Sequence, residues 1–135
     1  MRILPNKTLQ LEITMMAQAK DIVDQIGEML QLDHQVRSFQ LYCSRGTDEI
    51  IIPEKRRMMD VLSRMSEEDQ LLFAVYYYYP YELHNLSALR LVFDQAVHDL
   101  HCGRYFRGDE DYFILAALAL QERMQDYSGD NRVLW

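Results

Sequence analysis

The segment that decides the fold is residues 39–53, which read FQLYCSRGTDEIIIP. In its first part apolar residues alternate with more polar ones, as expected of a β-strand with one face against a core. Ser44-Arg45-Gly46 predicts a turn. The following Glu49-Ile50-Ile51-Ile52 predicts a second strand that ends at Pro53, because proline cannot donate a hydrogen bond to a central ladder. The segment therefore predicts a β-hairpin.

The pattern on both sides of this hairpin is also a mixture of strands and helices. Residues 1–4 and 8–14 read as two strands joined by a turn. Residues 17–30 carry apolar side chains three and four positions apart, which predicts an amphipathic helix that covers a sheet. After the hairpin, residues 55–65 carry a short helical stripe and residues 71–79 a β-prone run. The predicted order is ββαββαβ.

From about residue 80 only helical patterning remains. Asn85 can cap a helix whose apolar stripe reaches Leu100, and Gly103 lies where a left-handed residue would end it. A second helix is predicted after Gly108, where acidic residues at its first turn suit the positive end of the helix dipole.

The interior of the second helix is apolar on every side, so one partner helix cannot cover it. We therefore expect part of Phe113, Leu115 or Leu118 to be exposed, or to be buried between two copies of the chain. This pattern is explained if the helical domain is truncated. It is also explained if the sheet of the first part of the chain buries the rest of the helix.

Composition excludes several classes of function. The chain has 135 residues, of which 49% are hydrophobic, so it can bury a core. Its 14 Lys and Arg against 21 Asp and Glu give a formal net charge of −7, which argues against broad binding to nucleic acid or to an anionic bilayer. Only Cys43 and Cys102 are present, far apart, as in a reduced intracellular protein. We expect a cytoplasmic protein without a spanning helix.

One basic cluster is a candidate binding site. Lys55, Arg56 and Arg57, together with Arg64, can face an anionic partner or lipid headgroups. The alternative is a solvated turn before a helix. Three charges are a weak membrane anchor in a chain of net charge −7, so weak or no direct membrane binding is expected.

Other clusters favour structural roles. His98 and Cys102 are spaced to share one face of a helix, but zinc needs more ligands and only Cys43, on a distant strand, offers another thiolate. Tyr76–Tyr79 fits packing on a strand better than modification. Acidic runs at residues 67–69 and 109–111 read as solvated charge. We predict no catalytic residue, no metal site and no cofactor.

Two phrases in the helical part resemble a known family. Phe93-Asp94-Gln95, with Asp99 and Gly103 after it, resembles the aromatic-x-Gln, Asp and Gly series in the second lobe of FERM domains. Residues 115–127, LAALALQERMQDY, are similar to that family's Leu-Ala-Ala-Leu-x-x-Gln-x-x-x-Gly-Asp-Tyr phrase. Gln125 stands where the phrase has Gly, and Gly129 is a second candidate for the end of that helix.

This resemblance implies an α+β chain of two lobes. Residues 1–79 would be the ubiquitin-like β-grasp first lobe. Residues 80–135 would be the start of the acyl-CoA-binding-protein-like helical second lobe, truncated and with no third lobe. The aromatic last strand and short linker look most like tail-region myosins, talin-like proteins and related adaptors. We expect the interface between the lobes, or seam, to be filled by Tyr81, Leu83 and Leu86.

The resemblance also implies a function. It predicts a non-catalytic interaction and scaffolding module of a cytoskeletal or membrane-proximal adaptor. The partner would be the cytoplasmic tail of a membrane protein or a cytoskeletal protein, with no nucleic acid bound. Self-association through the incomplete helical lobe is a further expectation. The alternative is a ubiquitin-like regulatory domain that acts on an enzyme in the same polypeptide or complex.

Overall fold

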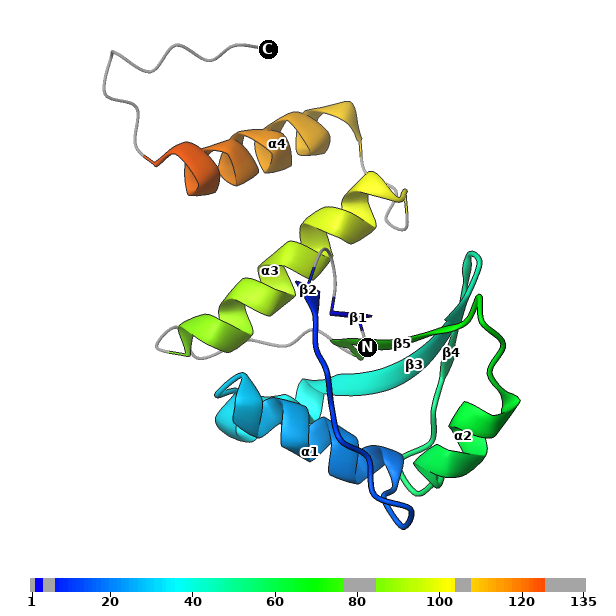
Figure 1. The fold of residues 1–135 in the computed structure, drawn as a ribbon. Coiled ribbons are helices and arrows are strands. Elements are labelled where there is room, and N and C mark those ends of the chain that lie inside the picture. The colour runs from blue at the N-terminus through cyan, green and yellow to red at the C-terminus, as the bar shows by residue number, and fades with distance from the viewer. Residues whose placement is uncertain (1, 4–6, 77–84, 104–107, 126–135) are drawn as a thin grey trace. The chain divides into compact units, whose positions relative to one another are not determined.

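The computed structural model describes residues 2–3, 7–76, 85–103 and 108–125. The chain forms two compact units, Met1–His98 and Asp99–Trp135. The first unit holds the whole sheet, and the second holds the end of one helix and all of the next (Figure 1). The predicted division at residue 80 is not the same boundary, and it stays a prediction.

The first unit is built on a five-stranded sheet in the order β2-β1-β5-β3-β4. β1 runs parallel to β5, whereas the other neighbours are antiparallel. The element order confirms the predicted α+β class and the ββαββαβ pattern. The strands are β1 (Arg2–Ile3), β2 (Lys7–Thr8), β3 (Phe39–Arg45), β4 (Asp48–Ile51) and β5 (Gln70–Val75).

The first unit contains α1, η1 and α2 as well as the first part of α3. Figure 1 shows α1 lying across one face of the sheet and α2 near one end. The short 3-10 helix η1, which the sequence pattern did not predict, follows α1 directly. Their bounds are α1 (Ala19–Met29), η1 (Asp33–Ser38) and α2 (Met58–Arg64).

The core lies between α1 and the inner face of the sheet. The Phe39 ring of β3 stacks on the Phe73 ring of β5, with centroids 4.9 Å apart and planes 7° from parallel. Ile22 and Ile26 of α1 are fully buried against the same cluster. Each such side chain contributes about 1.5–3 kcal/mol through burial, so this cluster is a major source of the stability of the unit.

The predicted strand over residues 8–14 is wrong beyond its first residue. β2 ends at Thr8, which pairs with Arg2, and no strand is assigned to residues 9–14. Leu9, Leu11 and Ile13 nevertheless pack partly buried against the core. The alternating pattern therefore marks a segment that places one set of its side chains against the core.

The first part of α3 (Leu86–His101) belongs to the sheet unit. Asn85 caps the helix as predicted, since its Oδ1 accepts the Ala88 N–H at 3.1 Å. The Asn85 Nδ2 also donates to the Leu32 carbonyl at 2.9 Å, which ties the helix start to the loop after α1. Ala88 is fully buried in the same core.

The expected role of Leu86 in the seam is corrected by the structure, because its side chain is 71% exposed. The buried face of α3 starts at Ala88, and a residue two positions earlier lies about 200° around the helix. Leu86 therefore faces away from the core. Tyr81 and Leu83, the other predicted seam residues, lie outside the described residues.

The second unit contains the end of α3 and α4 (Asp109–Met124). The left-handed φ of +71° at Gly103 agrees with the predicted helix end. No residue of α4 is buried, and its Phe113 is 77% exposed. This confirms that the apolar surface of the helix exceeds what its own unit covers.

The residue that follows α4 is Gln125, which caps the helix end with φ 64° and ψ −164°. This backbone conformation is one that glycine adopts most easily. The position where the FERM phrase has Gly is therefore left-handed here, although it holds Gln. Gly129, the other predicted helix end, lies outside the described residues.

Candidate functional site

The predicted basic cluster forms an ordered turn on the surface. Lys55, Arg56 and Arg57, which we call the basic turn, are exposed between β4 and α2. Its backbone is held to the start of α1, because the Arg56 carbonyl accepts the Ala19 N–H at 2.9 Å. The Ala17 carbonyl in turn accepts the Met58 N–H at 2.9 Å. The side chains thus project from a fixed backbone.

The cations of this region lack carboxylate partners in the described part of the chain. Neither the basic turn nor Arg64, which is also exposed, makes an ion pair there. By contrast, Arg45 pairs with Asp69 and Arg90 pairs with Asp94. The basic turn is therefore a local excess of positive charge in a chain of net charge −7.

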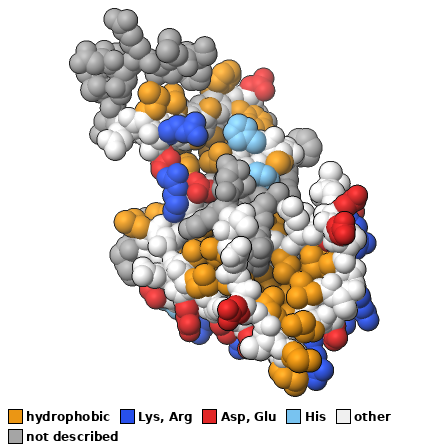
Figure 2. Space-filling view, in the orientation of Figure 1, with side chains coloured by type: hydrophobic (Ala, Val, Ile, Leu, Met, Phe, Trp, Pro, Cys, Tyr) orange, Lys and Arg blue, Asp and Glu red, His pale blue; other side chains and the backbone are white. Residues whose placement is uncertain are grey.

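The strand before the basic turn, β4, begins with Asp48 and Glu49 and ends with two exposed isoleucines. Among the described strands β4 pairs with β3 alone, so it forms one edge of the sheet. Ile50 is 58% exposed and Ile51 is 41% exposed, whereas the next residue, Ile52, is buried. Figure 2 shows hydrophobic side chains reaching the surface of the sheet unit in several places, with Lys and Arg side chains at its margin. The edge of β4 therefore offers backbone polar groups and apolar side chains to a partner, and the basic turn next to it offers cationic side chains.

Asp69 is a structural residue that the sequence pattern did not reveal. The predicted solvated charge of residues 67–69 is wrong at this position, because the Asp69 side chain is fully buried. Arg45 donates to it from Nε at 2.9 Å and from Nη2 at 2.8 Å, and the Ser66 N–H donates at 3.0 Å. The bonds from Arg45 and Ser66 hold the pKa of Asp69 well below its ordinary value. The bonds between Arg45 and Asp69 also raise the pKa of Arg45.

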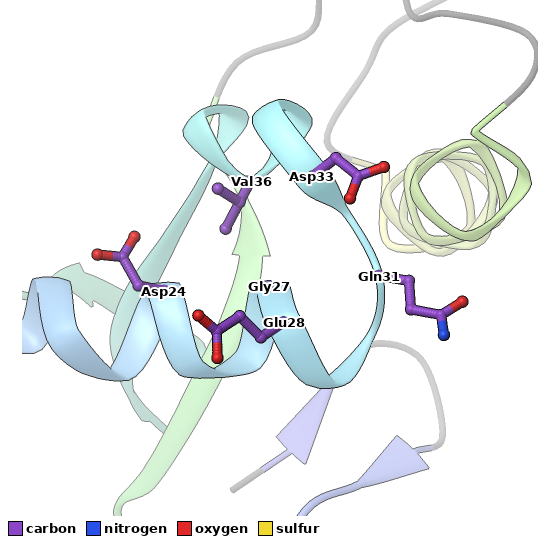
Figure 3. A pocket seen from close by; sticks show the side chains of 6 residues that line it. All are labelled: Asp24, Gly27, Glu28, Gln31, Asp33 and Val36. Carbon is purple, nitrogen blue, oxygen red and sulfur yellow. The ribbon is translucent and has the colours of Figure 1, made fainter.

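A hollow of about 500 Å³ lies between α1 and η1 (Figure 3). Its floor is a close contact in which the Val36 side chain points toward Gly27. Its walls carry mostly acidic or amide side chains, namely Asp24, Glu28, Gln31 and Asp33. Gln31 and Asp33 both have left-handed φ angles, 57° and 53°. The hollow therefore has an acidic rim around a small apolar floor.

The other sequence candidates do not assemble into a chemical centre. No three His, Cys, Asp or Glu side chains gather as a possible metal site in the described ranges. Cys43 is half-buried on β3, whereas Cys102 is exposed at the end of α3. Tyr76 is exposed, and the rest of the tyrosine run lies outside the described residues.

No helix among the described residues is long and apolar enough to cross a membrane.

Comparison with known proteins shows the fold. No family model matches the sequence, and no curated protein matches it. A solved structure, that of a mutant of the Dictyostelium discoideum myosin VII MyTH4-FERM MF2 domain, is similar to this chain with a TM-score of 0.83 at 18% sequence identity. The match covers 99% of this chain and 30% of that chain. The likeness confirms a FERM-like fold, and this chain spans less than a third of the length of that structure.

Proposed function

We propose that this chain is a non-catalytic protein-interaction module of a cytoskeletal or membrane-proximal adaptor. The observation that carries the proposal is the exposed apolar face of α4. Phe113, Ile114, Leu118 and Met124, which define this face, are all exposed. At 100° per residue they fall within about 140° of one another around the helix. An exposed apolar surface of this kind on a helix is typical of a protein interface.

The fold supports the same proposal. The chain resembles part of a myosin MyTH4-FERM domain, and an adaptor role in the cytoskeleton is consistent with that likeness. In the proposed arrangement residues 1–79 are the ubiquitin-like lobe and residues 80–135 are the start of the helical lobe. The protein would act in the cytoplasm, at the cytoskeleton or the inner surface of a membrane.

The partner in this proposal is a protein, because the net charge of −7 disfavours nucleic acid and anionic lipid. The cytoplasmic tail of a membrane protein and a cytoskeletal protein are the two classes considered. A second copy of this chain can also occupy the apolar face of α4, so self-association is part of the proposal.

The test compares the wild type with a Phe113→Ser/Leu118→Ser double variant. We expect proximity labelling in cells to mark cytoskeletal or membrane-protein neighbours of the wild type, and the double variant to lose them. Sedimentation of the purified proteins would show whether self-association is lost as well. Met15→Ser is the control, since Met15 is similarly exposed but lies in the other unit. An unchanged set of neighbours for the double variant would contradict the proposed function.

A further inference from the structure

We propose that the outer edge of β4 binds an extended peptide as an added antiparallel strand, with acidic residues of the peptide against the basic turn. This inference rests on the proposed function, because it names a second surface of the interaction module and the chemistry of its partner. This second surface consists of β4 and the basic turn and does not include α4.

The backbone of β4 has a defined outward side. Residues on an antiparallel strand alternate between those that bond to the neighbour and those that point away from it. The Ile52 N–H donates to the Leu41 carbonyl at 2.9 Å, and the register then makes Ile50 and Cys43 the next bonded pair. Ile51 lies between these two positions, so its N–H and C=O point toward the outer edge. A peptide strand can bond to both groups.

The side chains of β4 add apolar contact on both faces of such a strand. Ile50 lies on the same face as buried Ile52, and Ile51 lies on the opposite face, where its register partner is Tyr42. Edge strands that avoid pairing carry Lys, Pro or a bulge at central positions. β4 has Glu49 and Ile50 at its central positions and Ile51 at its end, so its charged residues lie in its first half. The two exposed isoleucines of its second half favour pairing with apolar residues of a partner.

Charge determines the order of residues in the peptide. The basic turn follows the carboxyl end of β4, and an antiparallel peptide would place its amino-terminal residues there. Exposed Asp48 is at the other end of the strand. The best ligand therefore begins with acidic residues, continues with β-prone apolar residues and ends with a basic one. This order is complementary to Asp48, the two isoleucines and the basic turn.

A protein segment fits this surface better than a lipid bilayer does. Lipid headgroups can meet the three cations of the basic turn, but they cannot form a ladder with the Ile51 backbone. β4 ends at Ile51, and Pro53 two residues later has no N–H to donate, so only a short ladder can form. Such a short ladder depends strongly on its charged end, and binding should therefore weaken as salt is added.

The test uses the full chain labelled with ¹⁵N and a synthetic peptide of sequence Glu-Glu-Val-Val-Ile-Thr-Lys with blocked ends. We expect amide shifts confined to β4 and the basic turn. The exchange of the Ile51 amide should slow, while that of Ile52, already bonded to Leu41, should not change. Replacing all three residues of the basic turn by Ala should weaken binding by about tenfold.

Two controls separate a ladder from a general attraction of charges. The same peptide with an N-methyl group on the backbone amide that faces β4 keeps every side chain but cannot complete the ladder, so it should not bind. Ile50→Lys should abolish binding without unfolding the exposed edge, and Met15→Lys should not affect it. Equal binding of the methylated peptide would overturn the proposal.

The remaining outcomes are equally decisive. No amide shift at a peptide concentration of about 1 mM overturns the docking site, because it implies negligible affinity. A third outcome would assign the surface to a membrane instead. In it the chain is retained on vesicles with 20% phosphatidylserine, this retention is lost when the three residues of the basic turn are replaced by Ala, and the peptide does not bind. Loss of cellular neighbours in the Phe113→Ser/Leu118→Ser variant would still support the proposed function if the peptide failed. Failure of both experiments would remove both proposals.

Discussion

Gln95 of α3 bonds to both backbone polar groups of Val75 at the end of β5. The Val75 N–H donates to Gln95 Oε1 at 2.6 Å, and Gln95 Nε2 donates to the Val75 carbonyl at 3.4 Å. Among the described residues β1 pairs with β5 at Leu72 and Phe73, and the two polar backbone groups of Val75 bond to the Gln95 side chain. This contact joins α3 to the sheet within one unit.

Replacing Gln95 by Leu should lower the free energy of unfolding by about 2–3 kcal/mol, because it leaves two buried backbone groups of Val75 without partners. Urea denaturation would measure the loss, and hydrogen exchange should show faster exchange at the Val75 amide. Asp94→Ala is the control, since it removes only an exposed pair with Arg90 and should cost less than about 0.5 kcal/mol. Equal effects would show that the Gln95 contact is unimportant.

Asp69→Asn should lower the melting temperature by several degrees at neutral pH, because it removes the charge of a buried carboxylate that accepts hydrogen bonds from the exposed Arg45 and from the Ser66 N–H. In the wild type this carboxyl has a lowered pKa in the folded state, so its stabilisation is full above the unfolded pKa of about 3.9. It is lost as the pH falls below that value toward the folded pKa. Melting curves between pH 7 and pH 2 would show a smaller acid-induced loss in Asp69→Asn than in the wild type.

The matched control for that series is Glu68→Gln, which removes an exposed carboxylate next to Asp69 in sequence. Its melting temperature should stay close to that of the wild type across the same pH range. If the two variants gave the same curves, the pairing of the buried Asp69 carboxylate with Arg45 could not be the source of the acid sensitivity.

Gly27→Ala should destabilise the sheet unit by about 1–3 kcal/mol, because a Cβ at this position would lie 2.6 Å from Val36 Cγ2. Adding Val36→Ala should recover part of the loss, since it removes the atoms that clash. Gly108→Ala is the control, because no atom lies within 4 Å of its added Cβ. Chemical denaturation of the wild type, the two single variants Gly27→Ala and Val36→Ala, the double variant and Gly108→Ala would provide the comparison. Additive losses in the double variant would contradict the close contact.

Gln125→Gly should stabilise the end of α4 by about 1 kcal/mol, because glycine adopts the left-handed conformation of this residue without strain. The far-ultraviolet circular dichroism signal of the helices should then persist to a higher temperature. Ala117→Gly should have the opposite effect, since it places glycine within a helix. A lower helical stability in Gln125→Gly would show that the Gln side chain itself holds the helix end.

Gln35→Met should raise the free energy of unfolding by about 1 kcal/mol. The Gln35 side chain is buried in η1, and its amide nitrogen and oxygen have no hydrogen-bond partner among the described residues. Methionine has a similar length and no polar group to desolvate. Denaturation midpoints would measure the change, and a loss of stability would indicate that a water or another group satisfies the amide.

The sequence by itself determined the element types and much of their order. Strands and helices differ in the period of their apolar residues, and this local property predicted the hairpin of β3 and β4 as well as α1, α3 and α4. Local chemistry also placed the cap at Asn85 and the left-handed glycine at Gly103. Both signals depend only on residues a few positions apart, so they can be recognised without knowing the fold.

The tertiary structure alone decided which polar residues are structural. Arg45 and Asp69 are 24 residues apart, and Gln95 and Val75 are 20 apart, so no local pattern marks either pair. It also decided that β4 is an edge strand, which is what makes Ile50 and Ile51 accessible next to the basic turn. Burial and partnership depend on how distant segments meet, and the same side chain is a surface charge in one packing and a buried link in another.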